Sequence, residues 1–294
     1  MPELVNNTAT DASLNLIDET FDISQAGSYH LSIQSGEDGL SLCVLNTVIN
    51  KYIVLRNYPF RSFGKDETAL SAYRRIFDND DILRLRYKSC SHVWVSPRCT
   101  LFPGHLFDPE NSSACLNFNH GRKAGESTLY NHLHVVQLYN IFSQPDDLGA
   151  LLKQYQPDIT LCHHATLFVN WMISRSYATS RPLVAIYYYG NYADIMVIRD
   201  RKLLFYNTFY INNPEDSIYY LTGILNLFDM QLASTAISYV GDLHNSPDNV
   251  EIIRKYALRI IECSPLDTAT YSHYMTESLR KRFTHLFNLQ GCAS

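Results

Sequence analysis

The sequence has no long hydrophobic run and no strong excess of charge. No stretch approaches the roughly 20 apolar residues of a membrane-spanning helix, so no membrane span is predicted. The formal net charge is −5, with 24 Lys and Arg against 29 Asp and Glu. So weak a field does not concentrate nucleic acid or anionic membrane. We interpret the most basic stretch, residues 278–285, as a solvated helix face and expect no nucleic-acid partner.

An apolar leader and paired cysteines are also missing. Residues 1–22 contain acidic residues and no basic start followed by an apolar run, so no signal peptide is predicted. The seven cysteines are odd in number and have no C-x-x-C spacing, as expected of reduced thiols. We therefore expect a cytoplasmic protein whose cysteines fill its core.

The motifs of the common enzyme classes are absent: no P-loop, G-x-S-x-G or G-x-G-x-x-G occurs. His132 and His134 share one face of a predicted strand, and Cys162, His163 and His164 follow one another; either set could ligate a metal. No partner at fixed spacing, such as H-E-x-x-H, accompanies them, so we expect no metal. A Cys-His hydrolase built on Cys162 stays open.

What the chain does have is a three-strand pattern that occurs twice. It covers residues 29–57 and again residues 183–209, in a chain whose 46% hydrophobic content can form a large core. In each copy an apolar strand leads into a glycine turn, at Gly36 and Gly39 or at Gly190, and a second strand follows. A short polar turn then leads to a third strand. Each copy is thus predicted to be a β-meander.

The same elements follow each copy. After the first, Asp66 is the predicted N-cap of a helix, and a strand is predicted at residues 91–95. After the second, Asn213 caps a helix with Pro214 at its first position, and a strand is predicted at residues 236–240. The offset of about 150 residues exceeds the 20 to 50 residues of solenoid repeats, so it indicates two similar lobes.

The remaining segments complete an α/β chain with mixed sheets flanked by helices. We predict a strand at 127–137, a helix at 145–155, a strand at 159–162, a helix at 167–173 and a terminal helix at 271–287. The first lobe is assigned to residues 1–180, with a loop insertion near 103–125, and the second to residues 181–294. Whether the terminal helix packs back on the first lobe stays open.

Duplicated meanders of this kind resemble the actin-like ATPase fold, with ribonuclease H-like lobes, shared by actin, sugar kinases and the pilus-assembly actin-like proteins. More closely, residues 203–221 (LLFYNTFYINNPEDSIYYL) and 237–242 (ISYVGD) resemble a bacterial domain-of-unknown-function family assigned to that fold. The resemblance covers nearly the whole chain and implies the fold more than an activity.

That fold makes a chemical demand which this chain does not meet. Its enzymes place an Asp at the end of the first strand of each lobe, where it organises Mg²⁺ beside the phosphates. Here Gln34 stands at that place in the first lobe and Tyr188 in the second. Gln34 is neutral, and a tyrosine with its usual pKa near 10 is protonated at pH 7. A ribonuclease H-type nuclease needs a carboxylate at the same place.

The flanking residues are unfavourable as well, because Glu37 and Asp38 would face a triphosphate with like charge. The candidate residues of a vestigial nucleotide cleft are therefore Gln34, Ser35, Gly36, Gly190, Gly241 and Asp242. In the alternative interpretation, the glycines only permit tight turns.

We therefore predict a protein that does not hydrolyse ATP and binds another protein, with no cofactor. The 21 tyrosines are compatible with an interface, where this residue is enriched. The alternative is an atypical nucleotide-binding ATPase or small-molecule kinase that recruits Glu37, Asp194 or Asp242 to the metal. Side chains of Tyr188 or Tyr189 filling the cleft would favour the binding protein, and an inward-pointing carboxylate would favour the enzyme.

Overall fold

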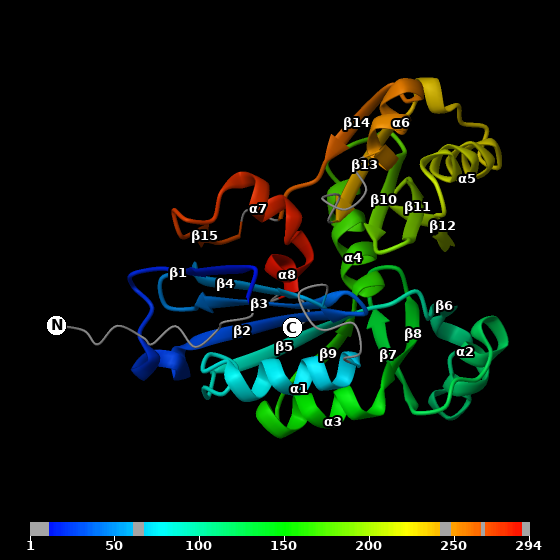
Figure 1. Cartoon of the computed structure of the whole chain (residues 1–294). Helices are drawn as coiled ribbons and strands as arrows, with labels where there is room; N and C mark the ends of the chain where they lie inside the picture. Colours follow the sequence, from blue (N-terminus) through cyan, green and yellow to red (C-terminus); the bar gives the residue numbers. More distant parts are fainter. Residues whose placement is uncertain (1–11, 61–67, 242–247, 266–267, 290–294) are drawn as a thin grey trace.

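The computed structural model describes residues 12–60, 68–241, 248–265 and 268–289, which form two lobes set at an angle (Figure 1). The first lobe contains a seven-stranded mixed sheet of order β1-β4-β3-β2-β5-β9, with β15 also paired to β4. Its strands are β1 (Leu14–Ile17), β2 (Tyr29–Gly36), β3 (Gly39–Asn46), β4 (Lys51–Pro59), β5 (Ser89–Val95), β9 (Thr160–His163) and β15 (Thr270–Tyr271).

The second lobe contains a five-stranded sheet of order β12-β11-β10-β13-β14. Its strands are β10 (Leu183–Tyr189), β11 (Tyr192–Arg199), β12 (Lys202–Tyr210), β13 (Ala236–Gly241) and β14 (Arg259–Glu262). This order repeats β4-β3-β2-β5-β9, with an antiparallel meander followed by two parallel strands in both sheets. The predicted duplication is confirmed, and it extends one strand further than the sequence pattern indicated.

Equivalent helices join the meander to the first parallel strand in each lobe: α1 (Ala69–Asn79) and α5 (Pro214–Asn226). Asn213 caps α5 as predicted, accepting a hydrogen bond from the Asp216 amide at 3.2 Å in a capping box. For α1, the N-cap among the described residues is Thr68, while the predicted Asp66 lies outside them.

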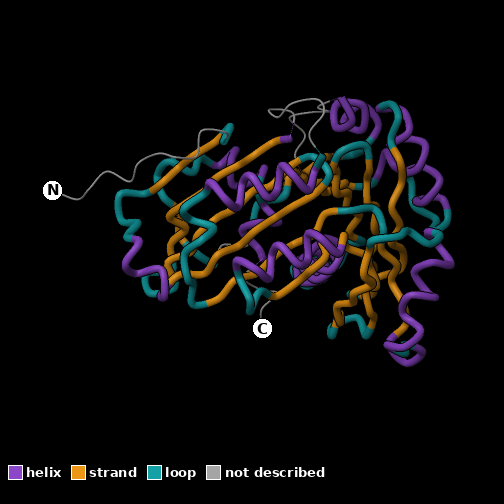
Figure 2. Tube along the Cα trace, turned by 60° about the horizontal axis from the view of Figure 1, so that its bottom comes forward, coloured by secondary structure: helices purple, strands orange, loops and turns teal. Residues whose placement is uncertain are grey.

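Helices cover both faces of the first sheet. On one face, α1 and α3 (Asp146–Tyr155) pack over β2 and β3 and enclose Phe77 and Leu152 (Figures 1 and 2). On the other face, α7 (Glu277–Arg282) and α8 (Thr284–Asn288) enclose Tyr52 and Leu286. The second sheet carries α5 and α6 (Asp248–Tyr256) on its outer face. Each sheet is thus a central layer between apolar cores.

One helix, α4 (His164–Ser176), connects the lobes. It contacts β5, β7 and β9 on one side and β10 and β11 on the other. Phe168 and Met172 pack against Met196 and Ile198 of the second sheet. Most residues of α4 are buried, around most of its circumference. This is the pattern of a helix enclosed on several sides, not of an amphipathic surface helix.

A small three-stranded sheet extends the first lobe, with order β6-β8-β7. It consists of β6 (Cys99–Pro103), β7 (Glu126–Leu133) and β8 (Leu138–Pro145), with α2 (Ser112–His120) beside it. The predicted strand at 127–137 is wrong at its end, because the chain leaves β7 after Leu133 and turns at Gln137, whose φ is 55°. His134 therefore lies in a turn.

The predicted terminal helix at 271–287 is wrong in its first part. Tyr271 belongs to β15, which pairs with Tyr52 of β4, and two short helices follow. The second of these, α8, contacts β2 and β3 of the first lobe together with α4 and β13. The chain thus returns to the first lobe near its end. The boundary at residue 180 stays a prediction. None of the described helices is both long and apolar enough to cross a membrane.

Candidate functional site

A pocket of about 100 Å³ lies where the two lobes meet. Four of the predicted cleft residues line it: Gln34 and Gly36 at the end of β2, Gly190 after β10, and Gly241 at the end of β13. They come together because β2, β10 and β13 all direct their carboxyl ends to the junction. Asp242, also predicted, lies outside the described residues.

The turn after β2 is a tight hairpin in which Gly36 faces Gly39. A β-carbon at Gly39 would lie 2.5 Å from the carbonyl oxygen of Tyr58, so this glycine is required by the close approach of β4. The hydroxyl of Tyr73 donates to the carbonyl oxygen of Gly36 at 2.5 Å and holds the turn from α1. This carbonyl is thus part of the packing of the lobe.

Ser35 does not line the pocket, although the sequence made it a candidate. Its side chain is buried on the other side of β2, where Oγ lies 2.6 Å from Nε2 of His92. The physical reason is the alternation of side chains along a strand, which puts Gln34 and Ser35 on opposite faces. Gln34 remains at the pocket and is half-buried.

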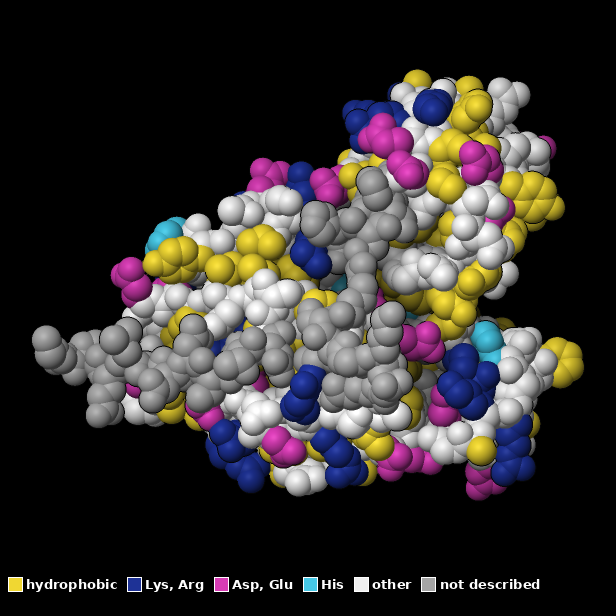
Figure 3. Space-filling model, viewed as in Figure 1, with side chains coloured by type: hydrophobic (Ala, Val, Ile, Leu, Met, Phe, Trp, Pro, Cys, Tyr) yellow, Lys and Arg dark blue, Asp and Glu magenta, His cyan; other side chains and the backbone are white. Residues whose placement is uncertain are grey.

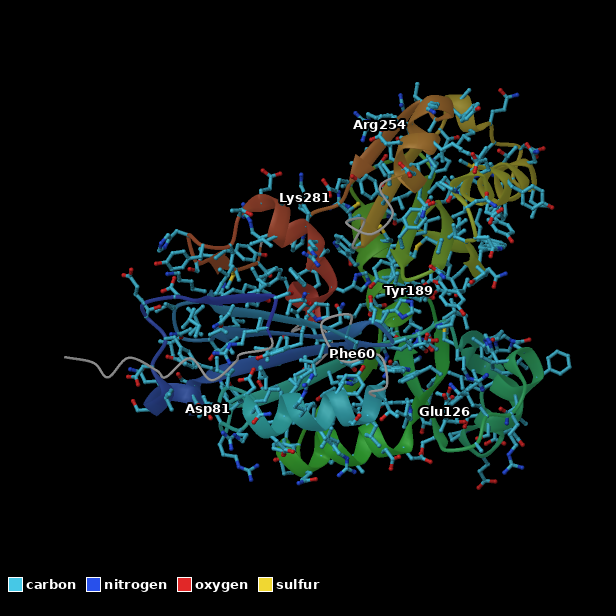
Figure 4. The ribbon with its side chains drawn as sticks, viewed as in Figure 1. Phe60, Asp81, Glu126, Tyr189, Arg254 and Lys281 are labelled. Carbon is cyan, nitrogen blue, oxygen red and sulfur yellow. The ribbon has the colours of Figure 1, made fainter. Side chains whose placement is uncertain are left out.

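The second turn, at Gly190 and Asn191, follows three tyrosines at the end of β10, whose side chains alternate in direction. The hydroxyl of Tyr188 donates to Ser217 Oγ of α5 at 3.0 Å, so its ring is part of the second lobe's outer core. Burial raises the pKa of this phenol, which keeps it protonated. All three tyrosines line the pocket, Tyr187 and Tyr189 from the other face of β10, and Tyr189 lies at the junction of the lobes (Figure 4). The predicted place of the metal-organising Asp thus holds a tyrosine anchored in the core.

The close approach of two strands requires the glycine at the end of β13. Gly241 lies opposite Tyr188 in the parallel pairing of β13 with β10, and its φ is +111°. A β-carbon there would stand 2.1 Å from the carbonyl oxygen of Tyr188. The glycine is therefore needed for strand pairing whether or not a ligand binds beside it.

The end of the chain also reaches this pocket, which the sequence did not indicate. Arg282, Phe283 and His285 line it from α7 and α8. The ring of His285 stacks on Tyr187 at 4.1 Å between ring centroids. Burial lowers the pKa of His285 to about 3, helped by repulsion from His164, so the imidazole is neutral at pH 7.

Of the three carboxylates that the alternative prediction assigned to a metal, the two that the structure describes, Glu37 and Asp194, do not line the pocket. Asp194 is fully buried on β11, where His164 Nε2 lies 2.7 Å from it. The hydroxyls of Tyr189, Tyr206 and Thr208 donate to the same carboxylate. Glu37 lines a different pocket beside α1, and Asp242 lies outside the described residues. The carboxylate of Asp38 does line the junction pocket.

The predicted histidine pairs do not assemble a metal site. The rings of His132 and His134 lie 3.9 Å apart between centroids, and His132 stacks on Tyr139. His163 Nε2 lies 3.1 Å from the carbonyl oxygen of Ser96, whereas His164 binds Asp194. Among the described residues, no group of three or more His, Cys, Asp or Glu could hold a metal ion.

Mg-ATP, which this fold implies, does not fit the residues present. Ligand pockets usually measure about 300–1,000 Å³, several times the volume of about 100 Å³ found here. Neither Gln34 nor Tyr188 supplies the charge that would balance a divalent cation. The tyrosines at the end of β10, together with Phe283 and His285, are among the residues that line this pocket.

Comparisons with known proteins place the chain in a family and a fold. No curated protein matches its sequence. A protein with actin-like ATPase fold and unknown function from Bacteroides thetaiotaomicron has a TM-score of 0.75 and 21% identity, over 82% of this chain and 93% of that chain. The PilM-PilN type IV pilus biogenesis complex has a TM-score of 0.55 and 10% identity, over 88% of this chain and 97% of that chain. Both similarities establish the actin-like fold. The family model described as protein of unknown function (DUF3822) matches residues 18–260, and the chain belongs to that family.

Proposed function

We propose that this protein binds another protein and does not hydrolyse ATP. The observation that carries the proposal is the state of the pocket between the lobes. It has a volume of about 100 Å³, and Gln34 and Tyr188 stand where enzymes of the fold use Asp. Tyr189 lies at the wall of this pocket, the arrangement that favours a binding protein over an enzyme.

A surface suited to a partner lies on the second lobe. On α5, Tyr219 is 74% exposed, and Leu227 just after the helix is 72% exposed. Tyr210 of β12 is 47% exposed, and β12 is an edge strand of its sheet. Hydrophobic side chains gather over α5 and β12 in Figure 3. Aromatic residues are enriched in protein interfaces, and an open strand edge offers backbone hydrogen bonds to a partner strand.

A neighbour of the same fold supports this class of function. One of the similar structures is the PilM-PilN complex, in which a protein of this fold is found together with another protein. The partner of the present chain is expected to contact Tyr210, Tyr219 and Leu227.

Partner binding is tested by affinity capture from the native cell with the wild type and with Tyr219→Lys combined with Leu227→Lys. Loss of the same captured protein from the double variant supports the proposal. Phe118→Lys is the matched control, since Phe118 is 91% exposed on α2 in the first lobe. Equal capture by wild type and double variant contradicts the proposed surface.

The alternative, an atypical nucleotide-binding ATPase or small-molecule kinase, is favoured by Asp38, whose carboxylate lies at the pocket beside Gly36. A thermal-shift titration with ATP, ADP and GTP, each with Mg²⁺ and with EDTA, separates the two functions. A ligand at about 100 times its Kd stabilises the native state by about 2.7 kcal/mol. We expect no shift with any nucleotide. A magnesium-dependent rise would favour the enzyme.

A further inference from the structure

Three arginines line one pocket of the second lobe. Arg175 comes from the end of α4, Arg181 from the loop before β10, and Arg259 from the start of β14. The pocket has a volume of about 440 Å³, which is in the range of small-molecule sites at about 300–1,000 Å³. It is thus more than four times the size of the pocket between the lobes.

These arginines form no ion pair with the described part of the chain. None of the three side chains has an ion pair or a hydrogen bond to another described residue, and no Asp or Glu of the described ranges lines the pocket. Arg175 is half-buried and lies over the ring of Trp171 at 5.8 Å. Arg56, which is buried in the first lobe, is by contrast paired with Asp80 at 2.6 Å. Like charges around one hollow repel each other, and a bound anion would relieve that repulsion.

The rest of the lining completes a site for an organic anion. Oγ1 of Thr179 accepts a hydrogen bond from the backbone amide of Arg181 at 3.1 Å. The hydrogen of the same hydroxyl is therefore available to donate to a ligand in the pocket. Leu183, Met230 and Ile261 contribute apolar surface to the same pocket. Guanidinium groups suit bidentate contacts with carboxylate or phosphate oxygens, and the apolar residues suit a hydrocarbon body.

The surroundings favour a small ligand over a long polyanion. Asp200 and Arg181 line the same adjoining hollow. On β14, Arg259 is the first residue and the exposed Glu262 is the last. An extended nucleic acid or anionic membrane surface would meet these carboxylates and the net negative charge of the chain. A compact anion seated in the pocket would avoid them.

The pocket is also independent of the junction between the lobes. It lies at the amino ends of the parallel strands β10, β13 and β14, whereas Gly190 and Gly241 stand at the carboxyl ends of β10 and β13. The seven residues of β10 separate the two places by about 20 Å at 3.3 Å per residue. A ligand here would not occupy the vestigial cleft.

We propose that the second lobe binds a small organic oxyanion with at least two negative charges, held by Arg175, Arg181 and Arg259. Isothermal titration calorimetry at constant ionic strength tests this with two probes, inorganic pyrophosphate and citrate, which distinguish phosphate from carboxylate ligands. We expect saturable binding of at least one probe by the wild type. Arg181→Gln and Arg259→Gln should each raise its Kd by about 10- to 100-fold, the usual effect of losing a charged hydrogen bond.

The matched control is Arg254→Gln. Arg254 lies on α6 of the same lobe, is exposed and pairs with Glu251 at 3.6 Å, outside the pocket (Figure 4). Its loss should leave the Kd within about twofold, because Arg254 does not line the pocket and its charge acts on a ligand there only through screening solvent. The proposal is overturned if neither probe binds at millimolar concentration, or if Arg254→Gln weakens binding as much as Arg181→Gln. Tighter binding of a poly-glutamate peptide or an oligonucleotide than of both probes would overturn the small-ligand assignment.

Discussion

The carboxylate of Asp194 and the imidazole of His164 meet at 2.7 Å in a fully buried contact between β11 and α4. Tyr189, Tyr206 and Thr208 direct their hydroxyls at the same carboxylate, so its two oxygens accept four groups. Since α4 also packs against the first lobe, this cluster ties the second sheet to the helix that joins the lobes.

Asp194→Asn should destabilise the protein strongly. The amide removes the charge and turns one acceptor into a donor that faces hydroxyl and imidazole groups. Each hydrogen bond to a charged group is worth about 1.5–3 kcal/mol, so the loss should be several kcal/mol. Urea denaturation followed by circular dichroism measures the loss. Asp81→Asn is the matched control, because its pair with Arg84 is exposed and is worth about 0–1 kcal/mol. Similar losses in the two variants would show that the buried cluster contributes no more to the free energy of unfolding than the exposed ion pair does.

Gly241→Ala and Gly190→Ala should lower the stability of the protein by different amounts, although both glycines line the junction pocket and both have a positive φ. Nothing lies within 4 Å of a β-carbon at Gly190, whereas one at Gly241 would stand 2.1 Å from a backbone oxygen. Gly190→Ala should therefore cost only the conformational penalty of about 1–2 kcal/mol. Gly241→Ala should cost clearly more, because β13 must move away from β10. Thermal melts compare the two, and equal midpoints would contradict the close approach.

Stability should fall below about pH 6.5 partly because of His285. Its pKa is about 3 in the folded protein and near 6.5 in the unfolded chain. The unfolded state therefore binds the proton first, and stability falls as pH decreases through this window, by up to about 1.4 kcal/mol per pH unit. His285→Gln should reduce that slope, measured by urea denaturation between about pH 6 and 4.5. An unaltered slope in His285→Gln would refute the assignment.

The fold could be predicted because the signals that encode it are local and occur twice. Glycine turns between apolar runs marked both meanders, and Asn213 with Pro214 marked the start of α5. The predictions that were wrong concern elements whose structure depends on packing between distant segments. The sequence near Tyr271 is equally suited to a helix, and only pairing with Tyr52 of β4 makes it a strand.

The candidate site was predictable in part for the same reason. Turn glycines located Gly36, Gly190 and Gly241, since the duplication implies that equivalent turns face each other. The contributions of Phe283 and His285 depend on the return of the chain to the first lobe, which no local pattern records. The arginine pocket was missed because Arg175, Arg181 and Arg259 form no motif and converge only through the parallel pairing of β13 with both β10 and β14.

Gln34→Asp distinguishes the two obstacles to nucleotide binding, the missing carboxylate and the small pocket. If only the charge were lacking, this substitution would restore a metal-organising group at the end of β2 and produce magnesium-dependent stabilisation by ATP. We expect none, because a pocket of about 100 Å³ is well below the roughly 300 Å³ at which ligand sites begin. Thermal shift and phosphate release measure the result, with Gln34→Asn as the neutral control.

Adding Phe283→Ala to Gln34→Asp should enlarge the pocket from the side of the terminal segment. Nucleotide binding that appears only in the combined variant would identify the end of the chain as the group that closes the cleft, whereas binding by Gln34→Asp alone would contradict the argument from volume.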